Sequence, residues 1–165
     1  MNLIFPAGLR TGGVVFAAMQ LELVTKDNVR RACDVKVHPA QEKFVAPVAV
    51  SLAEAYVHHD MAWPRVVVDG DRVVGFVMVA IQPDEPIEAY RFCLWRLAIA
   101  ADEQGRGYGR FAVREVAEEG RRRGIDKLHV TWVPGEGGPA EFYHRLGFVP
   151  TGEVLEGEVV GVLAL

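Results

Sequence analysis

A glycine-rich loop that joins an apolar stretch to an amphipathic one constrains the fold of this chain more than any other segment. Residues 93–100 are almost all apolar, as in a buried strand, and residues 111–119 mix apolar and charged side chains with the period of a helix. The loop between them, residues 104–109, contains Gly105, Gly107 and Gly109. Glycine allows positive φ and lets a ligand approach the backbone closely. The segment therefore predicts a strand–loop–helix unit of an α/β domain.

The junction of this loop with the helix is suited to an anion. The first N–H groups of a helix have no acceptor within the helix, and the helix dipole places positive partial charge beside them. A phosphate or pyrophosphate binds well at such a place. The spacing Gly105-x-Gly107-x-Gly109 differs from the G-x-G-x-x-G of a dinucleotide-binding loop, and no Gly-Lys-Ser/Thr of a P-loop is present. We interpret the loop as the binding site of a phosphorylated cofactor of another class.

Two motifs carry a family resemblance. The pattern Gln104-x-x-Gly107-x-Gly109 resembles the pyrophosphate loop of the GNAT N-acetyltransferases, which bind acetyl-CoA. Residues 140–148, Ala-Glu-Phe-Tyr-His-Arg-Leu-Gly-Phe, resemble the second hallmark of that family, a short helix that carries a tyrosine and ends at Leu-Gly-Phe. The resemblance covers Met19 to the C-terminus. It implies an α/β GNAT fold, with a mixed, mostly antiparallel sheet of about six to seven strands flanked by about four helices.

Hydrophobic periodicity and turn residues predict the elements from Met19 onward. The spacing Ser51-x-x-Glu54 is that of a capping box and predicts the start of the second helix. The expected elements are a strand at 20–24, a helix from Thr25 to Pro39, a loop at 41–47, the helix opened by Ser51, a hairpin that turns at Asp69-Gly70, a loop at 82–86, the glycine-loop unit whose helix ends near Gly124, a strand at 127–133, the tyrosine helix, and a last hairpin around Gly157.

Composition excludes several classes of function. The net charge of −4 argues against a nucleic-acid surface, and no apolar run is long enough to span a membrane. The cysteines, Cys33 and Cys93, show no C-x-x-C spacing and fit a reducing, cytoplasmic setting, and the histidines show no metal-ligand spacing, so no metal is expected. Residues 1–18 lack the charged start of a signal peptide. We interpret them as a loose N-terminal extension or an upstream start, and residues 19–165 as the acetyltransferase domain.

The resemblance also implies how acetyl-CoA is held. The backbone of Leu97, Ala98 and Ile99 would pair with the pantetheine arm, and a backbone N–H there would polarise the thioester carbonyl. Tyr143 would give a proton to the departing thiolate. The other expected cofactor-binding residues are Gln104, Gly105, Arg106, Gly107, Tyr108, Gly109, Arg110 and Glu136, the last at a position where relatives commonly have Asn.

Further stretches bear on the acetyl acceptor. Residues 42–46, 51–55, 74–78 and 94–97 resemble the bacterial spermidine/spermine N-acetyltransferases, which acetylate polyamines and diamines. Val48 departs from that pattern, because such relatives often carry Asn there. A small-molecule amine is the implied partner. The residues expected to bind it are Glu42, Phe44, Glu54, Asp84, Glu85, Trp95 and Trp132, and the choice of general base stays open among the carboxylates.

Other functions remain as alternatives. The acceptor could instead be an aminoglycoside-like antibiotic, an amino acid or a protein N-terminus, or the chain could be a non-catalytic acetyl-CoA sensor. Tyr143 favours an enzyme, because a sensor has no use for a group that protonates a thiolate. No serine or cysteine lies in a recognisable nucleophile context, which favours direct transfer in a ternary complex. The oligomeric state, including a homodimer, stays open.

Overall fold

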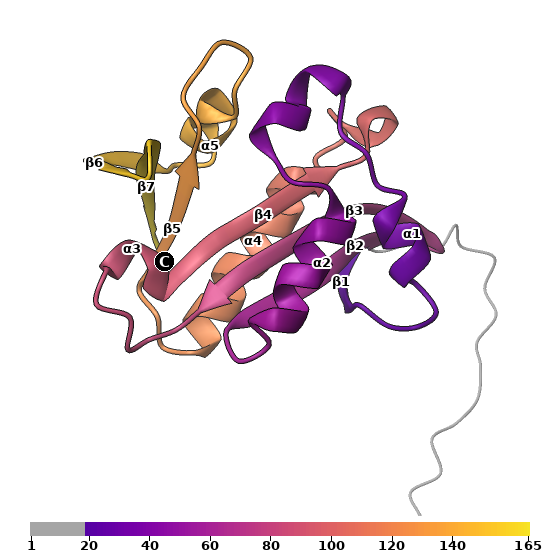
Figure 1. The fold of residues 1–165 in the computed structure, drawn as a ribbon, viewed down its shortest axis with the longest axis horizontal. Coiled ribbons are helices and arrows are strands. Elements are labelled where there is room, and N and C mark those ends of the chain that lie inside the picture. The colour runs from indigo at the N-terminus through magenta and orange to yellow at the C-terminus, as the bar shows by residue number, and fades with distance from the viewer. Residues whose placement is uncertain (1–18) are drawn as a thin grey trace, which may run out of the picture.

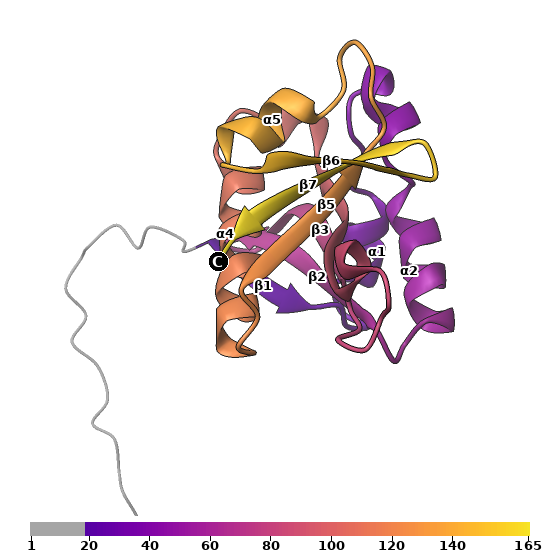
Figure 2. The same cartoon turned by 90° about the vertical axis from the view of Figure 1, so that its left-hand side faces the viewer.

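The computed structural model describes residues 19–165, so the interpretation of residues 1–18 lies outside the described part. The described residues form one seven-stranded sheet with helices on both faces (Figures 1 and 2). In chain order the elements are β1 (Met19–Leu23), α1 (Val29–Cys33), the 3₁₀ helix η1 (Pro39–Phe44), α2 (Val48–Val57), β2 (Ala62–Asp69), β3 (Arg72–Ile81), α3 (Glu88–Arg91), β4 (Phe92–Ile99), the 3₁₀ helix η2 (Ala101–Glu103), α4 (Tyr108–Arg122), β5 (Lys127–Trp132), α5 (Ala140–Arg145), β6 (Val149–Leu155) and β7 (Glu158–Ala164).

The sheet has the mixed, mostly antiparallel character predicted from the sequence. Its strand order is β1-β2-β3-β4-β5-β7-β6, and the pair β4–β5 is parallel while the other pairs are antiparallel. The described residues contain five α-helices, where about four were expected. The short α3 lies in a stretch for which the sequence predicted no element. The fold class is confirmed.

Two apolar cores hold the helices to the sheet. On one face, α4 packs its buried Phe111 and Val116 against strand residues that include Leu94. On the other face, α1 and α2 cover Phe76 and Met78 of β3. Figure 2 shows the sheet between α4 on one side and α1 and α2 on the other. Strand β4 lies in the middle of the sheet and contributes residues to both cores, so it is packed from both faces.

Strands β4 and β5 separate soon after they meet. Their pairing is confined to Cys93 with His129 and Leu94 with Val130. Just beyond, β4 carries a bulge: Leu94 is opposite Val79 and Arg96 is opposite Met78, which leaves Trp95 without a partner on β3. A bulge bends its strand and increases the local twist. The backbone of β4 beyond Leu94 therefore has no strand beside it on the β5 side, and a fork opens between the two strands (Figure 1).

Three sequence predictions between Thr25 and Ser51 are wrong. The helix expected from Thr25 to Pro39 is only the short α1, and Pro39 begins η1 instead of ending a helix, so the loop expected at 41–47 is largely η1. Proline suits a first helical position because its missing N–H would have no acceptor there. Ser51 is not a cap, because α2 already starts at Val48 and the Ser51 hydroxyl donates to the Pro47 carbonyl one turn back, at 3.2 Å.

Candidate active site

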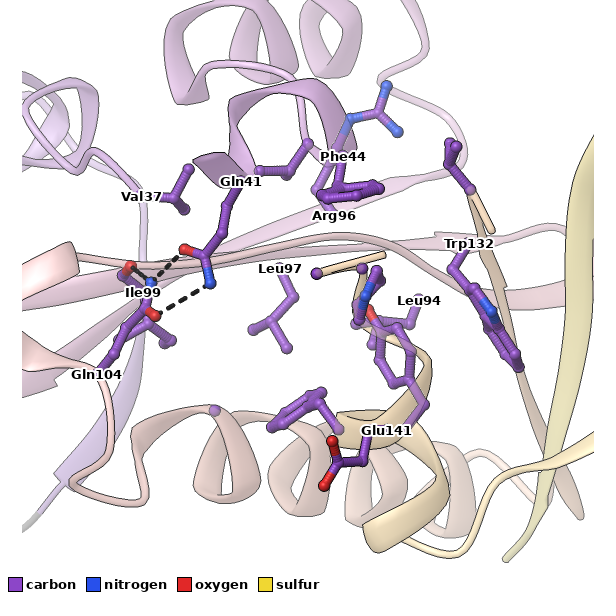
Figure 3. Close-up of a pocket in the computed structure, with 18 of the residues that line it drawn as sticks. Val37, Gln41, Phe44, Leu94, Arg96, Leu97, Ile99, Gln104, Trp132 and Glu141 are labelled. Atoms are coloured by element: carbon purple, nitrogen blue, oxygen red, sulfur yellow. Dashed lines mark hydrogen bonds between the residues drawn. The ribbon is translucent and has the colours of Figure 1, made fainter. Parts of the chain in front are cut away.

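A cavity of about 940 Å³ opens at the fork between β4 and β5. Its walls come from η1, the exposed edge of β4, the glycine-rich loop with the start of α4, the end of β5, and α5 with the loop before it. Figure 3 shows Gln41 and Phe44 on one side of β4, with Trp132 and Glu141 across the fork. The topology thus brings the two sequence motifs, which are separate along the chain, to one cavity.

The glycine-rich loop has the geometry that an anion site needs. Gly107 has φ of 89° and is the residue directly before α4, and Gly105 has φ of 78°. A Cβ atom added to either residue would meet no atom within 4 Å. The first helical bond of α4 runs from the Phe111 N–H to the Gly107 carbonyl, at 2.9 Å. The N–H groups in the first turn before Phe111 therefore have no acceptor within the helix and lie at the cavity.

A pair of glutamines ties this loop to η1. The Gln104 side-chain amide donates to the Gln41 Oε1 atom at 2.8 Å and to the Ile99 carbonyl at 3.1 Å, and Gln41 donates back to Gln104 Oε1 at 3.2 Å (Figure 3). Gln41 Oε1 also accepts the His38 backbone N–H at 3.1 Å. Sequence reasoning missed Gln41, because no local signal links two residues that are 63 positions apart.

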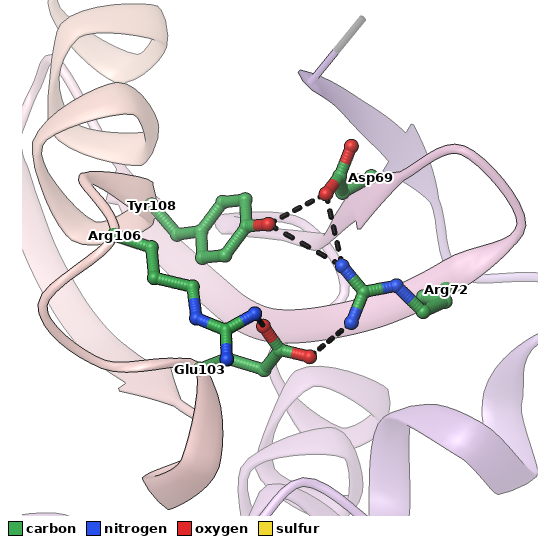
Figure 4. Close-up of polar contacts among 5 residues, drawn as sticks. All are labelled: Asp69, Arg72, Glu103, Arg106 and Tyr108. Atoms are coloured by element: carbon green, nitrogen blue, oxygen red, sulfur yellow. Dashed lines mark hydrogen bonds and ion pairs between the residues drawn. The ribbon is translucent and has the colours of Figure 1, made fainter. Parts of the chain in front are cut away.

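A polar cluster on the outer side of the loop anchors it to the β2–β3 hairpin (Figure 4). Arg72 forms ion pairs with Asp69, at 3.0 Å, and with Glu103, while Arg106 pairs with the other Glu103 oxygen at 3.0 Å. The Tyr108 hydroxyl donates to Asp69 at 2.5 Å. This hydrogen bond is the main reason that the pKa of Asp69 is lowered and that of Tyr108 raised. Arg106 is thus held in the cluster and does not line the cavity.

Tyr143 is buried at the inner end of the cavity. It is 8% exposed, and its ring packs against the rings of Trp132, Phe142 and Phe148, with centroids 5.7, 5.3 and 5.5 Å away. Burial raises the pKa of Tyr143 strongly, and the nearby Cys93 and Glu158 raise it further. The phenol therefore keeps its proton across the physiological range. A phenol in this state is a proton donor to an anion that develops beside it.

The expected cofactor-binding residues are brought together, with three exceptions. Leu97 and Ile99 of β4 line the cavity, as do Gln104, Gly105, Gly107, Tyr108, Gly109 and Arg110. Ala98 alternates to the opposite face of the sheet and packs in the core under α1 and α2. Arg106 lies in the polar cluster, and Glu136 does not line the cavity, although its neighbours Gly137 and Gly138 do.

The expected acceptor-binding residues are brought together less completely. Glu42, Phe44, Trp95 and Trp132 line the cavity. Glu54 does not line it, but its carboxylate pairs with Arg96, which does, at 3.1 Å. Asp84 and Glu85 lie in the β3–α3 loop and line a separate depression of about 370 Å³. Arg96 and Glu158, which sequence reasoning did not select, also line the main cavity.

Two further observations concern the described residues, 19–165. No helix among them is long and apolar enough to cross a membrane. No cluster of three or more His, Cys, Asp or Glu side chains there has an arrangement that could bind a metal ion.

A comparison with protein-family profiles identifies the family to which this chain belongs. Residues 28–148 match the sequence profile of the acetyltransferase (GNAT) family. A search of curated proteins found no match. Solved structures match the fold over 90% or more of this chain and of their own.

An acetyltransferase from Thermus thermophilus superposes with a TM-score of 0.71 at 19% identity, covering 91% of this chain and 99% of that chain. The PaiA N-acetyltransferase from Thermoplasma acidophilum, solved in complex with coenzyme A, gives 0.67 at 11% identity, with 90% and 99% covered. The ribosomal-protein-S18-alanine N-acetyltransferase from Escherichia coli gives 0.64 at 16% identity, with 90% and 93% covered. At these identities the likeness is one of fold.

Proposed function

The chain belongs to the acetyltransferase (GNAT) family, and we propose that it moves the acetyl group of acetyl-CoA to a primary amine of a small molecule. One observation carries the proposal, namely that three features meet in one cavity. They are the glycine-rich loop with the first turn of α4 (residues 104–110, called the anion cradle below), the part of β4 that has no strand on its β5 side, and the buried Tyr143. Each of these features serves a different part of the acetyl-CoA molecule. Residues 19–165 would form the catalytic domain.

In this proposal the cofactor lies along the fork. Its pyrophosphate would bind the free N–H groups in the first turn of α4, between Gly107 and Phe111. The pantetheine arm, which carries amide groups, would pair with the β5-facing backbone of β4 at Leu97 and Ile99, as an added strand does. The complex of the Thermoplasma acidophilum protein with coenzyme A supports the same choice of cofactor.

The chemistry needs a neutral amine, a polarised carbonyl and a proton for sulfur. The amine nitrogen would attack the thioester carbon while a backbone N–H of β4 stabilises the charge on oxygen. As the C–S bond breaks, Tyr143 would give its phenolic proton to the thiolate. The raised pKa of Tyr143 supports this role, because the phenol is still protonated when the thiolate forms. Transfer would be direct, with both substrates bound.

For the acceptor we propose a polyamine or diamine. The resemblance of residues 42–46 and 51–55 to spermidine/spermine acetyltransferases supports this choice. So do the carboxylates of Glu42 and Glu158 on the cavity wall, which suit a cationic chain.

A second acceptor class is favoured by a different observation. The Nε atom of Arg96 is buried, has no hydrogen-bond partner among the described residues, and belongs to a side chain on the cavity wall. The guanidinium already pairs with Glu54 at 3.1 Å, so a carboxylate of the acceptor would share it with Glu54 and use the remaining N–H. An amine that also carries a carboxylate, such as an amino acid, is therefore the alternative.

An acceptor panel separates these proposals. Release of free thiol from acetyl-CoA would be measured with spermine, spermidine, a diamine, an amino acid, an aminoglycoside, a peptide with a free N-terminus, and no acceptor. We expect the polyamines to give the highest kcat/KM and to lose it as salt is added, because screening weakens contacts between exposed charges. A faster reaction with the amino acid would favour the alternative. Acetyl-CoA binding without amine-dependent thiol release would contradict the enzyme proposal and favour a sensor.

A further inference from the structure

Glu158 is held in a defined place at the edge of the cavity. It is the first residue of β7 and follows a tight turn in which Glu156 and Gly157 both have positive φ, 52° and 86°. It is paired with Leu155 on β6, and the next residue along β7 is paired with Trp132 at the end of β5. A hairpin of this kind leaves the backbone of Glu158 little freedom.

The side chain of Glu158 lies on the sheet face opposite α4 and α5. Along β7, a Cβ at Gly161 would meet the Trp132 ring, and Val159 and Leu163 pack into the core that contains α4. Side chains alternate along a strand, so Glu158 points to the other face. Tyr143 approaches from α5, and both residues line the same cavity. The two groups therefore reach the fork from opposite sides.

Glu158 differs from the other carboxylates on the cavity wall. Glu141 is paired with Arg145 and is highly exposed, and Glu42 is exposed as well. Glu158 is half-buried, and none of the ion pairs within residues 19–165 includes it. A half-buried carboxylate without a cation beside it is a binding place for a cation that arrives from outside.

The charge of Glu158 acts on the groups around the fork. After burial, which is the main cause, Glu158 contributes to the raised pKa of Tyr143 and to that of Cys93, which reaches about 12. It also contributes to the raised pKa of Tyr90 on α3. These titratable groups lie on α5, β4 and α3. The negative charge of Glu158 therefore acts on groups around the fork between β4 and β5.

We propose that Glu158 binds the ammonium group of the acceptor and removes its first proton, an assignment that rests on the proposed acetyl transfer. The ammonium N–H bond breaks and its proton passes to a carboxylate oxygen of Glu158, which later releases it to water. The freed nitrogen lone pair forms the C–N bond, the C–S bond breaks, and sulfur receives the proton of Tyr143. The second proton of the nitrogen leaves through water and restores the phenol. The net reaction releases one proton per acetyl group transferred.

The test compares two glutamine variants. Glu158→Gln keeps the size of the side chain and removes its charge, and Glu156→Gln does the same for an exposed carboxylate in the turn just before β7, which does not line the cavity. At pH 7 with the best amine, we expect Glu158→Gln to lower kcat/KM about 10²-fold and Glu156→Gln to stay within about twofold. The Kd for acetyl-CoA, measured by calorimetry, should be unchanged in both. Near pH 10, where much of an alkylamine is already neutral, the loss in Glu158→Gln should shrink.

Each outcome has one meaning. If Glu158→Gln stays within about twofold of wild type at pH 7, or if its loss is the same at pH 7 and pH 10, the assignment is overturned while acetyl transfer stands. If wild type shows no amine-dependent thiol release, the proposed function fails first and the assignment fails with it. Should Glu158→Gln not fold, Glu158→Asp keeps the charge and withdraws it by one methylene. Full activity in that variant would likewise reject a direct proton transfer.

Discussion

Replacing Gly107 with valine tests the anion cradle most directly. Gly107 has φ of 89°, and a Cβ there meets no protein atom within 4 Å, so the first atom of the new side chain has open space. Two effects remain. The left-handed backbone costs a non-glycine residue about 1–2 kcal/mol. If the loop relaxes to avoid that strain, the first-turn N–H groups turn away from the phosphate, and a hydrogen bond to a charged group is worth about 1.5–3 kcal/mol.

The strain lowers stability in the free and the bound protein alike, so the expected loss of affinity comes from the hydrogen bond, and about 1.5–3 kcal/mol corresponds to an affinity for acetyl-CoA about 10- to 10²-fold weaker. Calorimetric titration of acetyl-CoA would measure the Kd, with thermal unfolding recorded in parallel. Gly124→Val is the matched control, because Gly124 also has positive φ, at 73°, and open space around its Cβ, but it lies beyond the far end of α4.

Both variants should lose a similar amount of stability, and we expect only the Gly107 variant to lose affinity. Unchanged affinity in a folded Gly107→Val protein, or an equal loss in Gly124→Val, would refute the cradle. An equal loss in both would point to general loosening of α4 instead of a local phosphate site.

Three more predictions follow from the site. Tyr143→Phe should lower kcat by about 10² to 10⁴ with little change in acetyl-CoA affinity, and turnover within about twofold of wild type would make Tyr143 structural. Gln41→Ala should raise the KM for acetyl-CoA about three- to tenfold through loss of one or two neutral hydrogen bonds to the loop, and an unchanged KM in steady-state kinetics would show that the Gln41–Gln104 pair does not hold it. Asp69 has a lowered pKa because Tyr108 donates to it, so its contribution to stability is present at neutral pH and is lost as pH falls through the folded-state pKa. Urea unfolding should therefore show Asp69→Asn less stable than wild type at pH 7, with the gap shrinking as pH falls below the usual pKa of an aspartate, about 3.9, and a gap that does not shrink on acidification would contradict this linkage.

Several features could be predicted from the sequence because their causes are local. The strand, the glycine-rich loop and the following helix depend on side-chain period, on positive φ at Gly105 and Gly107, and on the free N–H groups of one helix end. The tyrosine helix and the last hairpin around Gly157 are also set by neighbouring residues. These elements, and the family that they indicate, are confirmed.

Predictions from short-range sequence patterns fail most clearly in the segment that leads into α2. Ser51 has the spacing of a cap, yet α2 starts a turn earlier, and Pro39 begins a 3₁₀ helix that periodicity read as a loop. In both places a short-range pattern fits two structures. For α2 the choice between them was made by packing, since Val48 is buried against the sheet in the core under α1 and α2.

The sequence by itself thus determined the family of the chain, the glycine-rich loop before α4 and the short helix that carries Tyr143. Only the tertiary structure decided which charged groups share the cavity. The bulge at Trp95 and the early end of the β4–β5 pairing open the fork, and the register of β7 brings Glu158 to it while Asp84 and Glu85 are left at a separate depression. The residues next to a glutamate or aspartate in the sequence do not show whether its carboxylate lies at the cavity. Its role is set by strand register and by the faces to which distant segments turn their side chains, and these depend on pairing between residues far apart in the chain.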